Sequence, residues 1–220
     1  MQDIKIAALM SVPMCGWNPH WGCVSEAVRP FQIPIRLAYG AYWHQSISNL
    51  LEDCISDGLD WVLTLDYDSM FTAEHLDRLI GRFGQREDID ALAALQCKRS
   101  TDEVPLMTVQ GVDEVEINGE PIRADTAHFG LTLIRIDALK KVPLPWFRSV
   151  PDPNGSYKTL KRTDADIYFW REWQRAGNTL YVDPQCAIGH LQPLVSEYDA
   201  EFKVRHVHVT EWRKANRRTA

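Results

Sequence analysis

The chain has 220 residues, of which 45% are hydrophobic and 25% are charged, a balance that fits one folded domain and excludes a disordered or fibrous protein. Its 24 Lys and Arg residues against 30 Asp and Glu give a net charge of −6, which excludes a general attraction to nucleic acid or anionic membranes. The end of the chain differs, because Lys and Arg outnumber acidic residues over 203–220. We expect one domain over 1–195 and a basic C-terminal extension over 196–220, which contacts an anionic acceptor or stays solvated.

The cysteines and the apolar runs point to a cytoplasmic location. The five cysteines form no Cys-x-x-Cys pair, which argues against a zinc knuckle or a thioredoxin-like site. The first apolar run is interrupted by Pro13 too early for a signal peptide. No stretch approaches the roughly 18 apolar residues of a membrane-spanning helix. We therefore expect a cytoplasmic protein with reduced thiols and no membrane span.

Hydrophobic periodicity predicts alternating strands and helices in the first half of the chain. We expect strands over 4–10, 33–37 and 61–65, a loop over 11–22, a helix over 42–57, and a further helix capped by Thr72. This alternation predicts an α/β fold with a largely parallel sheet flanked by helices.

The second half is less regular. We expect strands over 91–97, 128–136 and 179–182, a hairpin over 108–123 with its turn at Asn118-Gly119, a short helix from Asp137, and a helix from Asp164 or Asp166 to Ala176. The segment 142–163 exceeds the usual length of a connection, which is typical of lids and binding loops.

Two aspartates, Asp66 and Asp68, directly follow the buried strand 61–65. Parallel sheets place ligand sites at the carboxyl ends of their strands. Residues i and i+2 of an extended chain point to the same side, so both carboxylates can reach one hard cation such as Mg²⁺ or Mn²⁺. Alternatively, Asp68 or Ser69 simply caps the helix that follows, which is the plainer explanation of an isolated Asp-x-Asp.

Three further stretches follow in order: FGLTLI at 129–134, DADIYF at 164–169 and IGH at 188–190. Together with Asp66-Tyr67-Asp68, this order resembles the GT-A glycosyltransferases, which transfer a sugar from a nucleotide-sugar donor. The resemblance covers roughly 4–190. It implies a GT-A fold, a Rossmann-like and mostly parallel central sheet flanked by helices, in a single domain with a C-terminal tail.

The resemblance also implies roles for individual residues. In the family the second Asp of the motif ligates the divalent metal, a role that falls to Asp68 here. The first Asp contacts ribose or metal, a role that falls to Asp66. The His of the last stretch supplies a third metal contact, here His190. The Gly of the second stretch lets the sugar approach, here Gly130. The nucleotide-base loop corresponds in position to Ser11, Val12 and Pro13.

The acidic stretch implies a catalytic base. Its best-matched carboxylate is Asp166, with Asp164 displaced by one position, because Ala165 stands where the family often has Glu. Either aspartate can instead cap the helix that begins there. In the long segment, Trp146 can stack on a sugar or acceptor base, or anchor the loop on the core.

We therefore predict a metal-dependent glycosyltransferase of the hexosyltransferase type, using Mn²⁺ or Mg²⁺ and a nucleotide-diphosphate sugar. Its hydroxyl acceptor is a glycan, a small molecule or a modified nucleic-acid base. One alternative is a sugar-1-phosphate nucleotidyltransferase, although the loop 11–22 lacks the Lys and Arg that such enzymes usually carry there. The other is a non-catalytic module that binds a nucleotide or sugar.

Overall fold

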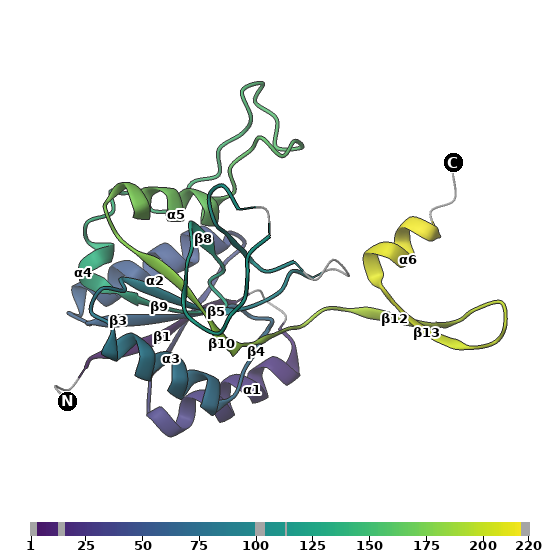
Figure 1. The fold of residues 1–220 in the computed structure, drawn as a ribbon, viewed down its shortest axis with the longest axis horizontal. Helices are drawn as coiled ribbons and strands as arrows, with labels where there is room; N and C mark the ends of the chain where they lie inside the picture. The colour runs from purple at the N-terminus through teal and green to yellow at the C-terminus, as the bar shows by residue number, and fades with distance from the viewer. Residues whose placement is uncertain (1–3, 13–15, 100–103, 113, 217–220) are drawn as a thin grey trace.

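The computed structural model describes residues 4–12, 16–99, 104–112 and 114–216. Its centre is a seven-stranded sheet (Figure 1). In spatial order the strands are β2 (Ile35–Tyr39), β1 (Ile6–Val12), β3 (Trp61–Leu65), β9 (Leu131–Arg135), β5 (Ala91–Leu95), β10 (Leu180–Ala187) and β7 (Ile122–Arg123). Strands β2, β1 and β3 are mutually parallel, as are β5 and β10, whereas β9 and β7 run antiparallel to their neighbours. The predicted mostly parallel sheet is confirmed.

Helices cover both faces of this sheet (Figure 1). Helices α2 (Trp43–Ser56), α4 (Ile136–Leu139) and α5 (Ala165–Arg175) pack on one face, and α1 (Asn18–Val28) and α3 (Ala73–Gln85) pack on the other. Successive strand residues point to opposite faces, so Leu9 and Val62 join the first layer while Met10 and Leu63 join the second. The result is a three-layer sandwich with one apolar core on each side of the sheet.

The boundaries of several elements agree with the sequence. Strand β3 has the predicted bounds, and α2 lies within one residue of the predicted helix at each end. Thr72 caps α3 as expected: its hydroxyl accepts from the His75 amide, and its own amide donates to His75 Nδ1 at 3.0 Å. A histidine thus takes the place that Glu or Gln usually holds in a capping box.

Two predicted elements are wrong. The last part of the expected loop 11–22 belongs to α1, which begins at Asn18. Pro19 does not prevent this helix, because proline is tolerated in the first turn. The described residues of 108–123 do not form the expected hairpin: β6 (Met107–Thr108) pairs with β8 (Thr126–Ala127), and β7 pairs with β10. Asn118-Gly119 is still a turn, since Asn118 Oδ1 accepts the amide of Glu120. The edge of a large sheet offers β7 a more stable partner than an isolated hairpin would.

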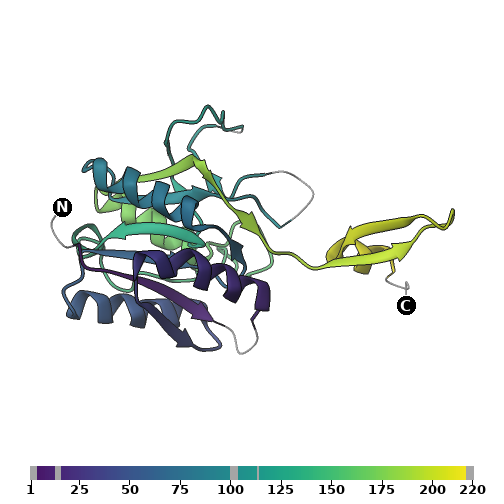
Figure 2. The same cartoon turned by 90° about the horizontal axis from the view of Figure 1, so that it is seen from below.

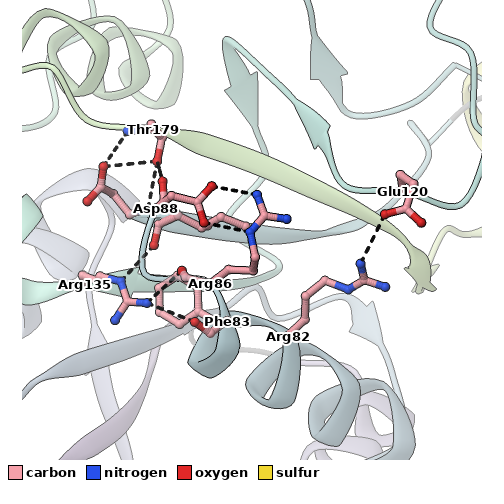
Figure 3. Close-up of polar contacts among 9 residues, drawn as sticks. Arg82, Phe83, Arg86, Asp88, Glu120, Arg135 and Thr179 are labelled. Carbon is pink, nitrogen blue, oxygen red and sulfur yellow. Dashed lines mark hydrogen bonds and ion pairs between the residues drawn. The ribbon is translucent and has the colours of Figure 1, made fainter.

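Arg135, at the end of β9, holds the backbone at the point where β5 begins (Figure 3). Its guanidinium donates to the backbone oxygens of Ile89 at 2.8 Å, Phe83 at 3.0 Å and Arg86 at 3.1 Å. These bonds tie the end of α3 to the start of β5. The start of β5 is therefore held in a fixed position. The other end of this strand lies at the side of the sheet where the parallel strands end.

The C-terminal segment forms an arm that projects from the body (Figures 1 and 2). It contains the hairpin of β12 (Leu194–Tyr198) and β13 (Val204–His208), followed by α6 (Val209–Ala215). Helix α6 packs on the hairpin, and the indole of Trp212 donates to Glu197 at 2.6 Å. Over the described ranges, no helix has the length and apolarity needed to cross a bilayer.

Candidate active site

A cavity of about 450 Å³ opens where β3 and β5 end. It lies at the carboxyl edge of the parallel strands, where the sequence places the ligand site. Four of the predicted residues line it: Asp66, Asp68, Asp166 and His190. The fold thus gathers parts of three separate sequence stretches in one hollow.

Asp68 is the most deeply buried of these carboxylates, with 3% of its surface exposed. Its Oδ2 lies 3.1 Å from Arg99 Nη1 and 3.4 Å from His190 Nε2. Among the described residues, this buried oxygen has no well-formed hydrogen bond. Burial alone would raise the pKa of Asp68, but His190, Arg99 and His20 outweigh burial and lower that pKa. Asp68 is therefore an ionised, sheltered carboxylate that lacks a full set of partners.

His190 reaches Asp68 through a short antiparallel pair. Strand β11 (Gly189–His190) lies beside β4 (Ser69–Met70), with His190 opposite Ser69. The His190 Nδ1 lies 2.9 Å from the carbonyl oxygen of Cys97, which can only accept, so Nδ1 carries the proton. The other ring nitrogen, Nε2, consequently faces Asp68. This arrangement is usual for a metal-binding histidine held by an outer hydrogen bond.

Asp66 directly follows β3, and its amide donates to the carbonyl oxygen of Gly130 at 3.4 Å. Burial, reinforced by the charge of Asp68, raises the pKa of Asp66 to about 7. Asp166 also adds to this rise. The surroundings therefore shift the pKa values of the two carboxyls in opposite directions: Asp68 stays ionised, and Asp66 takes up a proton more readily.

Asp166 and Asp164 lie at the start of α5 but face different surroundings. Asp166 is in the first turn and lines the cavity, where burial raises its pKa. Asp164 is exposed and forms an ion pair with Arg162 at 2.8 Å. Asp166 is therefore placed for chemistry in the cavity, whereas Asp164 contributes to the surface.

Three further predicted contacts, Ser11, Val12 and Gly130, are not among the residues that line the cavity. Gly130 is packed against protein: a Cβ there would collide with Ser69 Oγ and His128 Nδ1. Ser11 and Val12 are buried at the end of β1, beside β2, and Pro13 lies outside the described residues. Their assignment to the nucleotide base stays a prediction.

The stacking role expected for Trp146 does not fit its position. Only 4% of its surface is exposed, and its indole donates to the backbone oxygen of Val142 at 3.1 Å. It belongs to the core cluster with Phe147 and Phe169. The ring of Trp146 is covered by other residues of the core. Trp146 therefore anchors the long segment on the core, which is the second of the two roles considered from the sequence.

Several residues of the cavity were not predicted, chiefly Lys98, Arg99 and Gln96. All three follow β5. The rule that singled out Asp66 and Asp68 after β3 would have found Lys98 and Arg99, whereas Gln96 lay inside the expected strand 91–97. His128 was also missed. Its Nε2 donates to Ala94 at 2.8 Å and its Nδ1 accepts from Gly130 at 2.9 Å, while burial lowers its pKa to about 4. His128 is thus a neutral scaffold residue.

The side chains in the cavity suit a divalent ion for which the protein supplies only some of the ligands. Within the described ranges, no three His, Cys, Asp or Glu side chains are grouped so as to enclose a metal. Asp68 Oδ2, which pairs with Arg99 Nη1 at 3.1 Å, and His190 Nε2 nevertheless lie 3.4 Å apart at the same cavity. Mg²⁺-like ions typically take one or two carboxylates and fill their shell with water and phosphate oxygens. The residues fit such an ion.

No protein-family model matches the sequence, and no curated protein matches it by sequence. Solved structures do match its fold. The crystal structure of A197 from STIV is 13% identical with a TM-score of 0.56, covering 91% of this chain and 93% of that one. The mannosyltransferase PcManGT from Pyrobaculum calidifontis, in complex with GDP-Man and Mn²⁺, is 10% identical with a TM-score of 0.52.

The second match covers 86% of this chain but 57% of the mannosyltransferase, so this chain spans little more than half of that protein. At these identities the likeness concerns the fold alone. The chain has a glycosyltransferase-like fold of the GT-A type, and the fold class predicted from the sequence is confirmed.

Proposed function

We propose that this chain is a metal-dependent glycosyltransferase that moves a sugar from a nucleotide-diphosphate sugar to a hydroxyl acceptor. The observation that carries the proposal is the convergence of Asp66, Asp68, His190 and Asp166 on one cavity at the carboxyl edge of a GT-A sheet. A mannosyltransferase of related fold binds GDP-Man and Mn²⁺, which supports a nucleotide-sugar donor and a divalent ion. We place the reaction in the cytoplasm, where reduced thiols such as Cys54 and Cys186 persist.

Asp68 and His190 would hold the ion, with Asp66 beside them. A bound divalent ion acts as a Lewis acid that stabilises negative charge on the departing nucleoside diphosphate. Lys98 and Arg99 line the same cavity and meet the remaining phosphate charge. A poorly compensated diphosphate is a poor leaving group, so these cations lower the barrier to breaking the sugar–phosphate bond.

Asp166 serves as the base that takes the proton of the acceptor hydroxyl. A general base works best when its pKa approaches the working pH, and burial moves the pKa of Asp166 upward, in that direction. Its position in the first turn of α5 holds the carboxylate on a rigid element. Asp164, exposed and paired with Arg162, offers a natural comparison residue.

The proposal is tested with a panel of nucleotide-diphosphate sugars in the presence of Mn²⁺ or Mg²⁺. We expect one donor to raise the melting temperature and to be hydrolysed slowly without acceptor, because water replaces the missing hydroxyl. Saturation at about 100 times Kd would stabilise the protein by about 2.7 kcal/mol. If no nucleoside diphosphate shifts the melting temperature with either ion, the proposal fails.

The same assay separates the alternatives. A nucleotidyltransferase would consume a nucleoside triphosphate and a sugar-1-phosphate and release pyrophosphate, whereas a glycosyltransferase releases a nucleoside diphosphate. A non-catalytic module would bind the donor and leave it intact. Asp68→Ala should abolish turnover in an enzyme and should scarcely affect a binder that uses no metal.

A further inference from the structure

We propose that Gln96 is the positioning residue that holds the two halves of the candidate metal site, Asp68 and His190, at working distance. This inference rests on the proposed function of the site. Gln96 follows β5 and is nearly completely buried, with 3% of its surface exposed. It also lines the cavity that contains both candidate ligands.

The amide of Gln96 joins two segments that are distant in sequence. Its Nε2 donates to Ser69 Oγ at 3.1 Å and to the carbonyl oxygen of Gly189 at 3.0 Å. Ser69 is next to Asp68, and Gly189 is next to His190. One side chain therefore fixes the residue beside each candidate ligand.

Such a cross-link is needed because the two segments are weakly paired by themselves. Strands β4 and β11 share two residue pairs, Ser69 with His190 and Met70 with Gly189. One more backbone bond joins the segments, from the amide of Leu191 to the carbonyl oxygen of Asp68 at 2.8 Å. A ladder this short is still marginal without side-chain support. The bonds from Gln96 supply that support from the side of β5, which the bonds of Arg135 anchor at its other end.

The backbone around Gln96 strengthens the same frame. The carbonyl oxygen of Cys97 accepts from His190 Nδ1 at 2.9 Å, and Arg99 reaches Asp68 at 3.1 Å. The amide of Ile188 donates to Leu95 at 2.9 Å. The end of β5 thus contacts both halves of the site, and Gln96 adds side-chain bonds to the backbone bonds that join them. Groups that orient metal ligands in this way typically contribute 10–100-fold to metal affinity.

The test compares Mn²⁺ binding by the wild type with Gln96→Met, which keeps most of the volume and removes both donors. The probe is Mn²⁺ alone, measured by loss of the free-ion signal in electron paramagnetic resonance. We expect the Kd for Mn²⁺ to rise about 10- to 100-fold. The matched control is Asn178→Leu, which removes another buried amide that donates to a backbone oxygen, that of Ala138 at 2.9 Å. Asn178→Leu should lower the melting temperature and leave the Kd unchanged.

Two results would overturn the inference: an unchanged Kd in Gln96→Met, or an equal loss of Mn²⁺ affinity in Asn178→Leu. If Gln96→Met does not fold, Ser69→Ala removes one of the two bonds and should weaken Mn²⁺ binding by a smaller factor; an unchanged Kd there counts against the role. A wild type that binds no Mn²⁺ would refute the proposed function itself. If the wild type and the Gln96→Met variant bind Mn²⁺ with the same Kd, only the role of Gln96 is refuted.

Discussion

Asp68 Oδ2 lies 3.4 Å from His190 Nε2, although the two residues come from opposite halves of the chain. The His190 ring is turned toward Asp68 because its Nδ1 proton is bonded to Cys97. Asp68 is ionised, buried and short of hydrogen bonds among the described residues. An ionised oxygen facing an imidazole nitrogen in a cavity is a geometry that a divalent ion would complete.

Asp68→Asn should abolish metal-dependent turnover while preserving the fold. The amide keeps the shape but loses the charge, and a metal's stabilisation of the leaving group is worth several kcal/mol. We expect kcat/KM to fall by at least about 100-fold, which corresponds to roughly 2.7 kcal/mol. Steady-state kinetics with Mn²⁺ measures this. Asp164→Asn, on the exposed Arg162 ion pair, is the control and should retain activity.

Asp166→Asn should lower kcat and leave nucleotide binding intact. A general base acts in the transition state and contributes about 10²–10⁴-fold. The Kd for the nucleoside diphosphate, measured by calorimetry, should be unchanged because Asp166 is assigned to the acceptor side. Loss of nucleotide affinity with unchanged kcat would instead place Asp166 against the donor.

Arg99→Ala should weaken binding of the nucleoside diphosphate. Hydrogen bonds to charged groups contribute about 1.5–3 kcal/mol, so we expect Kd to rise by about 10- to 100-fold. The loss should shrink at high salt, because screening already weakens the charge contact in the wild type. Arg171→Ala is the control: Arg171 is exposed and bonds to Thr163 at 3.0 Å, away from the candidate phosphate contacts. Equal effects of both changes would contradict a specific phosphate contact.

Gly130→Ala should destabilise the protein, whereas Gly81→Ala should not. A Cβ at Gly130 would collide with Ser69 and His128, and overpacking of this kind costs about 1–3 kcal/mol. At Gly81, on the exposed side of α3, a Cβ meets no atom within 4 Å among the described residues. There alanine should stabilise the helix by up to about 1 kcal/mol. Urea denaturation of the two variants provides the comparison.

His128 should make the protein sensitive to acid. Burial lowers its pKa from 6.5 to about 4, so between these pH values the folded state binds fewer protons than the unfolded state. His128 therefore contributes a fall in the free energy of unfolding as the pH is lowered from 6.5 toward 4, whereas Asp66, with its pKa raised to about 7, contributes a rise. His128→Gln should remove this contribution of His128 to the pH dependence. Urea denaturation at several pH values tests the difference.

Local patterns predicted much of the fold and part of the site. Strand β3, the cap at Thr72 and the position of Asp66 and Asp68 follow from apolar spacing and from polar residues at a strand end. Helix α1 escaped prediction because Asn18 and Pro19 are typical of a loop, whereas the residues that bury this helix, such as Val24 and Ala27, come later in the chain. The bonds made by Gln96 and Arg99 were also out of reach, because such side chains find their partners only after distant segments fold together.

The most direct test of the metal site is a crystal structure with Mn²⁺ and the nucleoside diphosphate that stabilises the protein most. We expect an anomalous manganese peak within bonding distance of both Asp68 and His190 Nε2, with diphosphate oxygens completing the shell. Lys98 or Arg99 should contact the same diphosphate. A nucleotide bound elsewhere, or a manganese ion that contacts neither Asp68 nor His190, would contradict this expectation.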